Sequence, residues 1–448
     1  MLLDDPRSGV GGARRSPRSS TRVRTTAVLS AGAVVLIALQ IVAARHHFTG
    51  PLESLWADYT GTPKSFTVPW AGLGLALIGL SWRRRFLAAG AALGIDLIYQ
   101  AFRSLDGGPL AMGNGPVIVL TGLIVLAAWK WDGKDRGNAV HAAALGILLV
   151  LSSKIADVWL GITVLAGPKV LDQHIVLVDH ALGDPSWMMG QLLAWLGSAP
   201  SAVLHWVYIE LPMGAMIVTI WQLRNVVKTG EWPRHYLVRT FLTIGLIGPI
   251  FYIVFPVVGP MFAFGHDGGA FSLGDYWPNV VPPVNPNPGA LPFDHYTPRN
   301  CMPSLHTAWA LSIFIHSRRD TEGNPAPRWL RWGGAFWLLA TLSATLGFGY
   351  HYGADLVAGA VLCLTIESAL RAPERGWDPA RIRLVGAGAV LFGALLLSYR
   401  YVSDFYAAHP LPAGFIVLGL LAAFVTAFYR TWFAQLPAPA TPELPARV

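Results

Sequence analysis

The stretch RNCMPSLH at residues 299–306 and the stretch HYGAD at residues 351–355 decide the fold and the function of this chain. Both stretches place titratable side chains directly before long apolar segments that read as helices. Titratable groups at the mouth of an apolar helix are costly unless they have a partner or a role. The two stretches are therefore the first candidates for a catalytic site.

The composition around these stretches is that of a membrane protein. Of 448 residues, 53% are hydrophobic and only 13% are charged, and apolar windows of membrane-spanning length recur along the chain. Counting these windows predicts an all-α, polytopic membrane protein with about twelve transmembrane helices, of which about six form a catalytic core.

The basic residues predict the orientation in the membrane. The formal net charge is +8, but Lys and Arg occur in short clusters between alternate apolar windows, which is typical of cytoplasmic loops and excludes a nucleic-acid-binding protein. With the Arg-rich N-terminus in the cytoplasm, the loop 259–303 lies on the outer face. We therefore expect a multi-pass protein of the plasma membrane with His306 and His351 near its extracytoplasmic surface.

The sequence divides into five predicted segments. Residues 172–197 read as a pair of interfacial helices, and the Pro-rich loop 259–303 reads as a functional loop. The segments are a disordered basic tail (1–25), an accessory transmembrane region (26–169), the catalytic core (170–370), a C-terminal transmembrane pair (371–434) and a second disordered tail (435–448).

The residue types in the two stretches favour nucleophilic chemistry. His351 and Asp355 are i and i+4, so on one helix the carboxylate can hold the proton of one imidazole nitrogen and leave the other nitrogen as a nucleophile. His306 follows Pro303 and Ser304, which fit a helix start with Ser304 as the N-cap. Free amides at such a start attract an anion.

The two stretches resemble a known family. Residues 303–306 are similar to the second motif, and residues 351–355 to the third, of the phosphatidic acid phosphatase type 2 superfamily. Within this superfamily, the residues of both motifs resemble those of the inositol phosphorylceramide synthase and sphingomyelin synthase branch. The stretch 255–260 is also similar to the stretch that precedes the loop in that branch. The resemblance covers about residues 170–370.

This resemblance implies a mechanism and three catalytic residues. His351 attacks phosphorus to form a phosphohistidine, Asp355 orients and stabilises it, and His306 protonates the leaving oxygen. Water or an alcohol then accepts the phosphoryl group. The expected reaction uses no metal and no cofactor, and the sequence contains no carboxylate cluster that would hold a metal.

The chain also departs from the family pattern. The third motif usually has an Arg six residues before its His, and here that position is Thr345. Because a transferring phosphoryl group needs positive charge, we expect Arg299, aided by the amides around Ser304, to bind the substrate phosphate.

Other polar residues in apolar segments have weaker interpretations. Lys154 and Asp157 are i and i+3 and are expected to neutralise each other. Asp172 and Asp179 are candidates for contact with a substrate head group. The remaining polar residues are expected to serve packing or gating; they are Asp96, His205, Glu210 and Glu367.

The sequence therefore predicts an enzyme that acts on a phospholipid or polyprenyl phosphate, with water or an alcohol as the acceptor. The branch resemblance favours head-group transfer over hydrolysis. A lipid transporter or flippase stays open as a second class, because many spans with intramembrane charges suit it too. A vanadate-dependent haloperoxidase shares the His, His and Asp set, but the deep membrane embedding and the missing Arg disfavour it.

Overall fold

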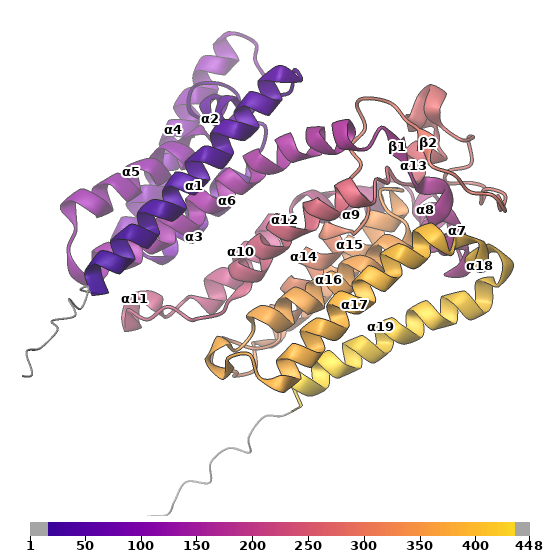
Figure 1. Cartoon of the computed structure of the whole chain (residues 1–448). Coiled ribbons are helices and arrows are strands. Elements are labelled where there is room, and N and C mark those ends of the chain that lie inside the picture. The colour runs from indigo at the N-terminus through magenta and orange to yellow at the C-terminus, as the bar shows by residue number, and fades with distance from the viewer. Residues whose placement is uncertain (1–16, 435–448) are drawn as a thin grey trace, which may run out of the picture.

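A computed structural model describes residues 17–434 of the chain, and the regular elements of this part are helices except for one short strand pair. Residues 1–16 and 435–448, parts of the two predicted tails, lie outside the described residues. Residues 17–25, also predicted as tail, belong to the first helix. Figure 1 shows two groups of helices, an N-terminal group and a larger group that holds the C-terminal two thirds of the chain.

The N-terminal group contains six helices. Its core consists of Leu, Val and Ala side chains of α3, α4, α5 and α6, and α6 is the long helix that leads into the second group. The helices are α1 (Pro17–Arg45), α2 (Pro51–Thr60), α3 (Thr67–Ile78), α4 (Trp82–Leu105), α5 (Asn114–Lys130) and α6 (Gly133–Ala166).

The second group begins with the predicted catalytic core. Residues 172–197 form two helices, in agreement with the predicted pair. The helices of this core are α7 (Asp172–Ala181), α8 (Pro185–Leu196), α9 (Ser198–Ile209), α10 (Leu211–Gln222), α11 (Val226–Thr229), α12 (Leu237–Val254), α13 (Pro260–Ala263), α14 (Leu305–His316), α15 (Arg328–Gly347) and α16 (Gly353–Leu370).

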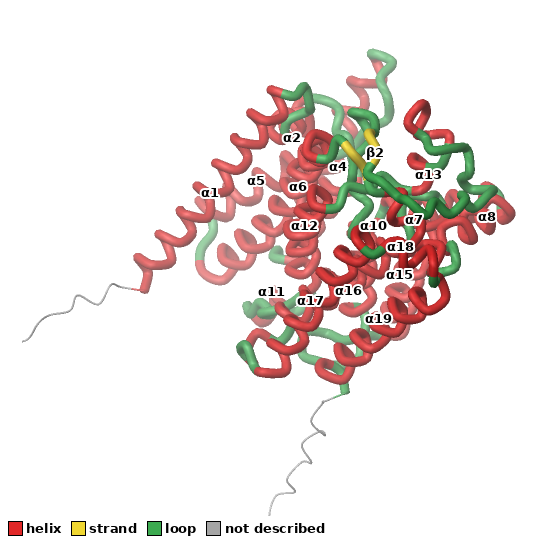
Figure 2. Tube along the Cα trace, turned by 45° about the vertical axis from the view of Figure 1, so that its right-hand side comes forward, coloured by secondary structure: helices red, strands yellow, loops and turns green. Residues whose placement is uncertain are grey.

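The loop between α12 and α14 is largely irregular, as its Pro and Gly content predicts. It contains α13, the 3₁₀ helix η1 (His266–Phe271) and strand β2 (Leu291–Pro292). Strand β2 pairs antiparallel with β1 (Lys169–Val170), which lies just before α7. Figure 2 shows these loops gathered with the strand pair at one end of the helices. This is the end at which α14 and α16 begin.

The C-terminal helices pack directly on the core. After the 3₁₀ turn η2 (Pro373–Arg375) come α17 (Pro379–Tyr401), α18 (Ser403–Ala408) and α19 (Pro410–Trp432). Helix α17 contacts α16, and α18 and α19 contact α7. One hydrophobic cluster includes Val361 of α16, Phe392 of α17 and Phe424 of α19. The C-terminal pair therefore shares its interior with the core.

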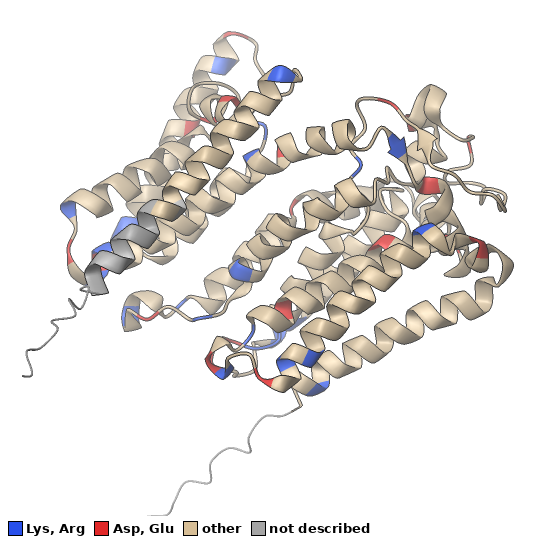
Figure 3. Ribbon diagram, in the orientation of Figure 1, with Lys and Arg blue, Asp and Glu red and all other residues tan. Residues whose placement is uncertain are grey.

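Five helices are long and apolar enough to cross a membrane, namely α6, α12, α16, α17 and α19. A sixth span results if α9 and the segment Leu211–Thr229, which are bent by 58° at their break, count together. The twelve predicted spans are not confirmed. Helices α3 and α14 have 12 residues each, about 18 Å at 1.5 Å per residue, against a hydrocarbon core of about 30 Å. Figure 3 shows the charged residues mainly near helix ends and in loops.

The intramembrane charges of the N-terminal group pair differently from the prediction. Lys154 does not pair with Asp157, its neighbour on α6. Its ammonium lies 2.6 Å from the Asp58 carboxylate of α2, and both side chains are buried. Asp157 instead lies 3.7 Å from Lys64, and this pair is exposed. The buried charge of Lys154 is therefore neutralised across the α2–α6 contact, where an unpaired buried charge would be costly.

Glu367, near the end of α16, joins the ends of three helices, α12, α14 and α16. Its carboxylate accepts hydrogen bonds from Thr240 at 2.6 Å and from the imidazoles of His235 and His316 at 3.0 and 3.2 Å. It also lies 2.7 Å from the Arg371 guanidinium. The predicted packing role of Glu367 agrees with this arrangement. The two histidines have no distinctive sequence spacing, and sequence reasoning missed them.

The amide of Gln222, on α10, sets the tautomer of His316. The backbone N–H of Leu237 donates to the Gln222 Oε1 at 3.0 Å, so the amide nitrogen faces His316 Nδ1 at 3.0 Å. An amide nitrogen only donates, so Nδ1 accepts and Nε2 carries the hydrogen that is donated to Glu367. The network therefore supplies hydrogen bonds to both oxygens of one buried carboxylate, and within the described residues only His235 Nδ1 of the two imidazoles is left without a partner.

Replacing this carboxylate is expected to destabilise the protein. In Glu367→Gln the amide NH₂ faces a group that can only donate in either orientation, either His316 Nε2–H or the Arg371 guanidinium, and Arg371 loses its counter-charge. We expect a loss of about 3 kcal/mol in the free energy of unfolding, seen as a lower apparent Tm in detergent. The matched control is Glu374→Gln, at an exposed position of η2, which leaves Tm unchanged. Equal Tm values for the two variants would contradict the assigned role.

Candidate active site

Helix α14 begins where the sequence predicts. Ser304 is its N-cap, and the Ser304 hydroxyl accepts a hydrogen bond from the Thr307 amide at 3.3 Å. The Ser304 amide donates to the backbone carbonyl of Asp355 at 3.0 Å. The two motifs are thereby joined backbone to backbone, although they are far apart in the sequence. Ser304 is fully buried.

His351 and Asp355 form a buried pair at the start of α16. The distance from His351 Nδ1 to Asp355 Oδ2 is 3.4 Å, and the two side chains are 5% and 0% exposed. This is ion-pair distance without the alignment of a hydrogen bond. The sequence interpretation places both residues on one helix, but α16 begins at Gly353 and His351 precedes it.

The backbone holds His351 in place from both sides. The amides of Tyr350 and His351 both donate to the carbonyl of Thr345, near the end of α15, each at 3.1 Å. The Tyr352 amide donates to Asp355 Oδ2 at 2.8 Å. Thr345, the position at which the family pattern has an Arg, thus contributes its carbonyl to the loop that carries His351.

His306 comes from α14 and lies close to His351. The two ring centroids are 6.4 Å apart, and the ring planes differ by 57°. The Tyr208 ring stacks on the His306 ring at a centroid distance of 4.0 Å and an angle of 19°. Tyr208 lies at the end of α9, next to the bend between α9 and α10. The bend therefore positions the aromatic ring that covers His306, a contact that sequence reasoning missed.

Asp172 and Asp179 of α7 support the start of α16. Asp172 accepts hydrogen bonds from the amides of Val258 and Gly259 and from the Tyr352 hydroxyl, at 3.1, 2.9 and 2.9 Å. Asp179 accepts the amide of Gly353. Burial raises the pKa of each carboxyl to about 7, although these donors favour the ionised form. Both side chains are fully buried against protein groups, where we predicted contact with a substrate head group.

The side chain of Arg299 is held by contacts within the loop 259–303 and with the end of α6. Its guanidinium donates to the carbonyls of Gly167, Thr297 and Asp294, and its side chain is fully buried. All three guanidinium nitrogens are therefore used to hold the loop 259–303 against the end of α6. A substrate phosphate would have to reach a guanidinium that is fully buried among these contacts. The predicted phosphate contact of Arg299 stays a prediction, and the observed contacts are structural.

Gly259 and Cys301 lie beside the pair of His351 and Asp355. Gly259 has φ +99°, and a Cβ there would lie 2.7 Å from the Tyr350 carbonyl and 3.1 Å from Cys301 Sγ. The Cys301 thiol donates to the Tyr350 carbonyl at 3.0 Å. Ligating atoms of Cys301, His351 and Asp355 all lie within 4.8 Å of one another. Only a glycine at position 259 fits both the positive φ and this close approach.

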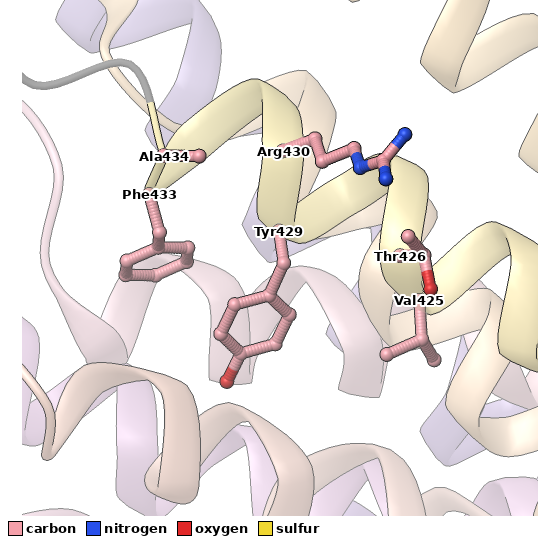
Figure 4. A pocket seen from close by; sticks show the side chains of 6 residues that line it. All are labelled: Val425, Thr426, Tyr429, Arg430, Phe433 and Ala434. Carbon is pink, nitrogen blue, oxygen red and sulfur yellow. The ribbon is translucent and has the colours of Figure 1, made fainter.

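The hollow in Figure 4 lies elsewhere. It measures about 430 Å³ and is lined near the end of α19 by Val425, Thr426, Tyr429, Arg430, Phe433 and Ala434. These residues include no pair of nucleophile and base. The cluster of His306, His351 and Asp355, at the opposite ends of the core helices, is the better candidate for a catalytic site.

Two protein-family models match parts of this chain. Residues 173–368 match the model of the PAP2 superfamily, the phosphatidic acid phosphatase type 2 family that the motifs resemble, so this region is a PAP2 superfamily domain. Residues 23–162 match a domain of unknown function (DUF5933). No curated protein and no solved structure matches the chain.

The stacking contact predicts that Tyr208 orients His306. Aromatic stacking contributes about 0.5–1.5 kcal/mol, so Tyr208→Leu is expected to lower kcat about 2- to 10-fold with little change in KM. Tyr208→Phe keeps the ring and retains kcat. The measurement is steady-state kinetics on a lipid phosphate that the wild type turns over, with apparent Tm as the folding control. Equal losses in the two variants would assign the effect to the hydroxyl instead.

Proposed function

We propose that this chain is an integral-membrane phosphotransferase that acts on a lipid-linked phosphate through a phosphohistidine at His351. The observation that carries the proposal is the meeting of His306, His351 and Asp355 at one end of the PAP2 superfamily domain. Membership of this superfamily suggests a phosphatase or phosphotransferase acting on lipid phosphates. The apolar helices suggest a membrane protein, which suits a lipid substrate.

The first half-reaction transfers the phosphoryl group to the enzyme. Asp355 faces Nδ1 of His351, so the proton is held on Nδ1 and the lone pair of Nε2 attacks phosphorus. The N–P bond forms while the bond to the leaving oxygen breaks. His306, in its protonated form, gives its proton to that oxygen.

The second half-reaction reverses these roles. An acceptor hydroxyl loses its proton to His306 and attacks phosphorus, and the N–P bond breaks. With an alcohol the enzyme is a transferase, as the resemblance to inositol phosphorylceramide synthases favours. With water it is a lipid or polyprenyl phosphate phosphatase, which is our alternative. Neither half-reaction includes a metal or a cofactor.

The negative charge of the phosphoryl group needs a positive field. Helices α14 and α16 both begin at this site, and the N-terminus of each carries a partial positive charge. The Ser304–Asp355 backbone bond holds these two helix starts together. We propose that this pair of dipoles supplies part of the stabilisation that an Arg at position 345 would give.

The proposed setting is the outer leaflet of the plasma membrane. The clustering of Lys and Arg in alternate loops supports a cytoplasmic N-terminus and an extracytoplasmic site. About twelve spans fit this arrangement if six further helices, α1, α3, α4, α5, α14 and α15, also cross the bilayer beside the six candidate spans. A lipid transporter or flippase is the competing proposal from another class.

A substrate panel separates these proposals. The purified protein in lipid is offered labelled phosphatidic acid, phosphatidylinositol and polyprenyl diphosphate, with and without alcohol acceptors. We expect His351→Ala to reduce turnover to background and His306→Ala to reduce it about 100- to 10,000-fold. The matched control is His295→Ala, an exposed histidine of the outer loop, which keeps full activity.

The products identify the acceptor. Free phosphate marks a phosphatase, and a product that carries the alcohol marks a transferase. Turnover that is the same in wild type and His351→Ala would overturn the catalytic proposal and favour transport.

A further inference from the structure

Two groups of ligating side chains occur in the described part of the chain. In each group, one ligating atom per residue lies within 4.8 Å of the others. The inner group contains His235, His316 and Glu367. The outer group contains Cys301, His351 and Asp355. Glu367 follows Asp355 by 12 residues on α16, so the groups lie about 18 Å apart along the helix axis.

The inner group has no room for a cation among its hydrogen bonds. Both oxygens of Glu367 accept hydrogen bonds, and Arg371 already supplies a positive charge. His316 presents an N–H to the centre of the group, and Gln222 fixes that tautomer. A metal would have to displace these donors. The inner group is therefore structural.

The outer group differs because two of its atoms lack partners, whereas the one unpartnered atom of the inner group within the described residues, His235 Nδ1, is not the nitrogen that faces Glu367. His351 Nδ1 and Asp355 Oδ1 make no hydrogen bond among the described residues, and both side chains are at least nine-tenths buried. Asp355 Oδ2 is the oxygen that accepts the Tyr352 amide, which leaves Oδ1 free. Leaving two polar atoms without partners at such depth costs free energy, unless a ligand completes them.

The third ligand is a soft one. Cys301 is 2% exposed, and its thiol makes a weak hydrogen bond to the Tyr350 carbonyl. Gly259 leaves the space beside Sγ that a side chain would fill. A set of one thiolate, one imidazole and one carboxylate suits Zn²⁺ and Cd²⁺ and does not suit Mg²⁺ or Ca²⁺.

We propose that Cys301, His351 and Asp355 bind one thiophilic divalent cation such as Zn²⁺, and that this binding inhibits the enzyme. On binding, the S–H bond of Cys301 breaks, the metal–sulfur bond forms and the proton leaves to water. The cation, the thiolate and the carboxylate then sum to zero charge. A neutral set of this kind is less costly to bury than an unpaired ion.

The inhibition follows from the tautomer of His351. A cation on Nδ1 forces the imidazole proton onto Nε2. That nitrogen then has no lone pair in the ring plane with which to attack phosphorus. The inhibitory part rests on the proposed function, whereas the binding part does not.

The test begins with metal binding, which needs no turnover. The untagged, metal-stripped chain in detergent is titrated with Cd²⁺, and thiolate-to-cadmium absorption is recorded in the ultraviolet. We expect one Cd²⁺ per chain in the wild type and no such absorption in Cys301→Ser. The matched control is Cys363→Ser. Cys363 is the second buried cysteine, lies deeper on α16 and belongs to neither group, so its variant keeps the signal.

A second variant keeps the test decisive if Cys301→Ser does not fold. Asp355→Asn retains the thiol but loses a charged ligand, and we expect its Cd²⁺ affinity to fall at least about 10-fold. A wild type without cadmium absorption, or a signal that persists unchanged in folded Cys301→Ser, would overturn the proposal.

The activity arm separates the two proposals. We expect Zn²⁺ to suppress wild-type turnover of the panel substrate and a chelator to restore it. If Cd²⁺ binds as expected but Zn²⁺ leaves turnover unchanged, the inhibitory role is wrong and the phosphotransferase proposal stands. If no panel substrate is turned over, the phosphotransferase proposal fails while the cadmium signal still decides the binding site.

Discussion

The hydrogen bond from the Ser304 amide to the Asp355 carbonyl is the constraint on which the candidate site depends. It joins the starts of α14 and α16, and each start carries one of the two histidines or lies beside it. Ser304 also caps α14, so one residue ends the loop between α12 and α14, begins a helix and holds the neighbouring helix in place. Both helix dipoles then point their positive ends toward the same space, which suits an anionic substrate.

A layer of buried polar contacts makes this geometry rigid. Asp172 joins the chain around Gly259 to Tyr352, and Asp179 holds the amide of Gly353. These carboxylates lie on α7, which also packs against α18 and α19. The C-terminal helices therefore stabilise the site indirectly, through their contacts with α7. Side chains held in this way keep a catalytic pair in a narrow range of positions without substrate.

Sequence reasoning could predict the features that have a local signature. The all-helical fold follows from apolar windows, the α14 start follows from Pro303 and Ser304, and the motifs identify the histidines. Features that depend on distant contacts had no such signature. The partner of Lys154 is Asp58 on another helix. The helix lengths, on which the number of spans depends, are also seen only in the fold, and the twelve predicted spans are not confirmed. The stacking of Tyr208 on His306 likewise arises from a helix bend.

The most direct test of the account is to trap the covalent intermediate. The wild type is mixed with a turned-over lipid phosphate, quenched under alkaline conditions that preserve phosphohistidine, digested and analysed by mass spectrometry. The account predicts a phosphoryl or substituted phosphoryl group on His351, absent from His351→Ala. A modification on another residue, or turnover that never labels the protein under conditions that trap a known phosphohistidine enzyme, would contradict it.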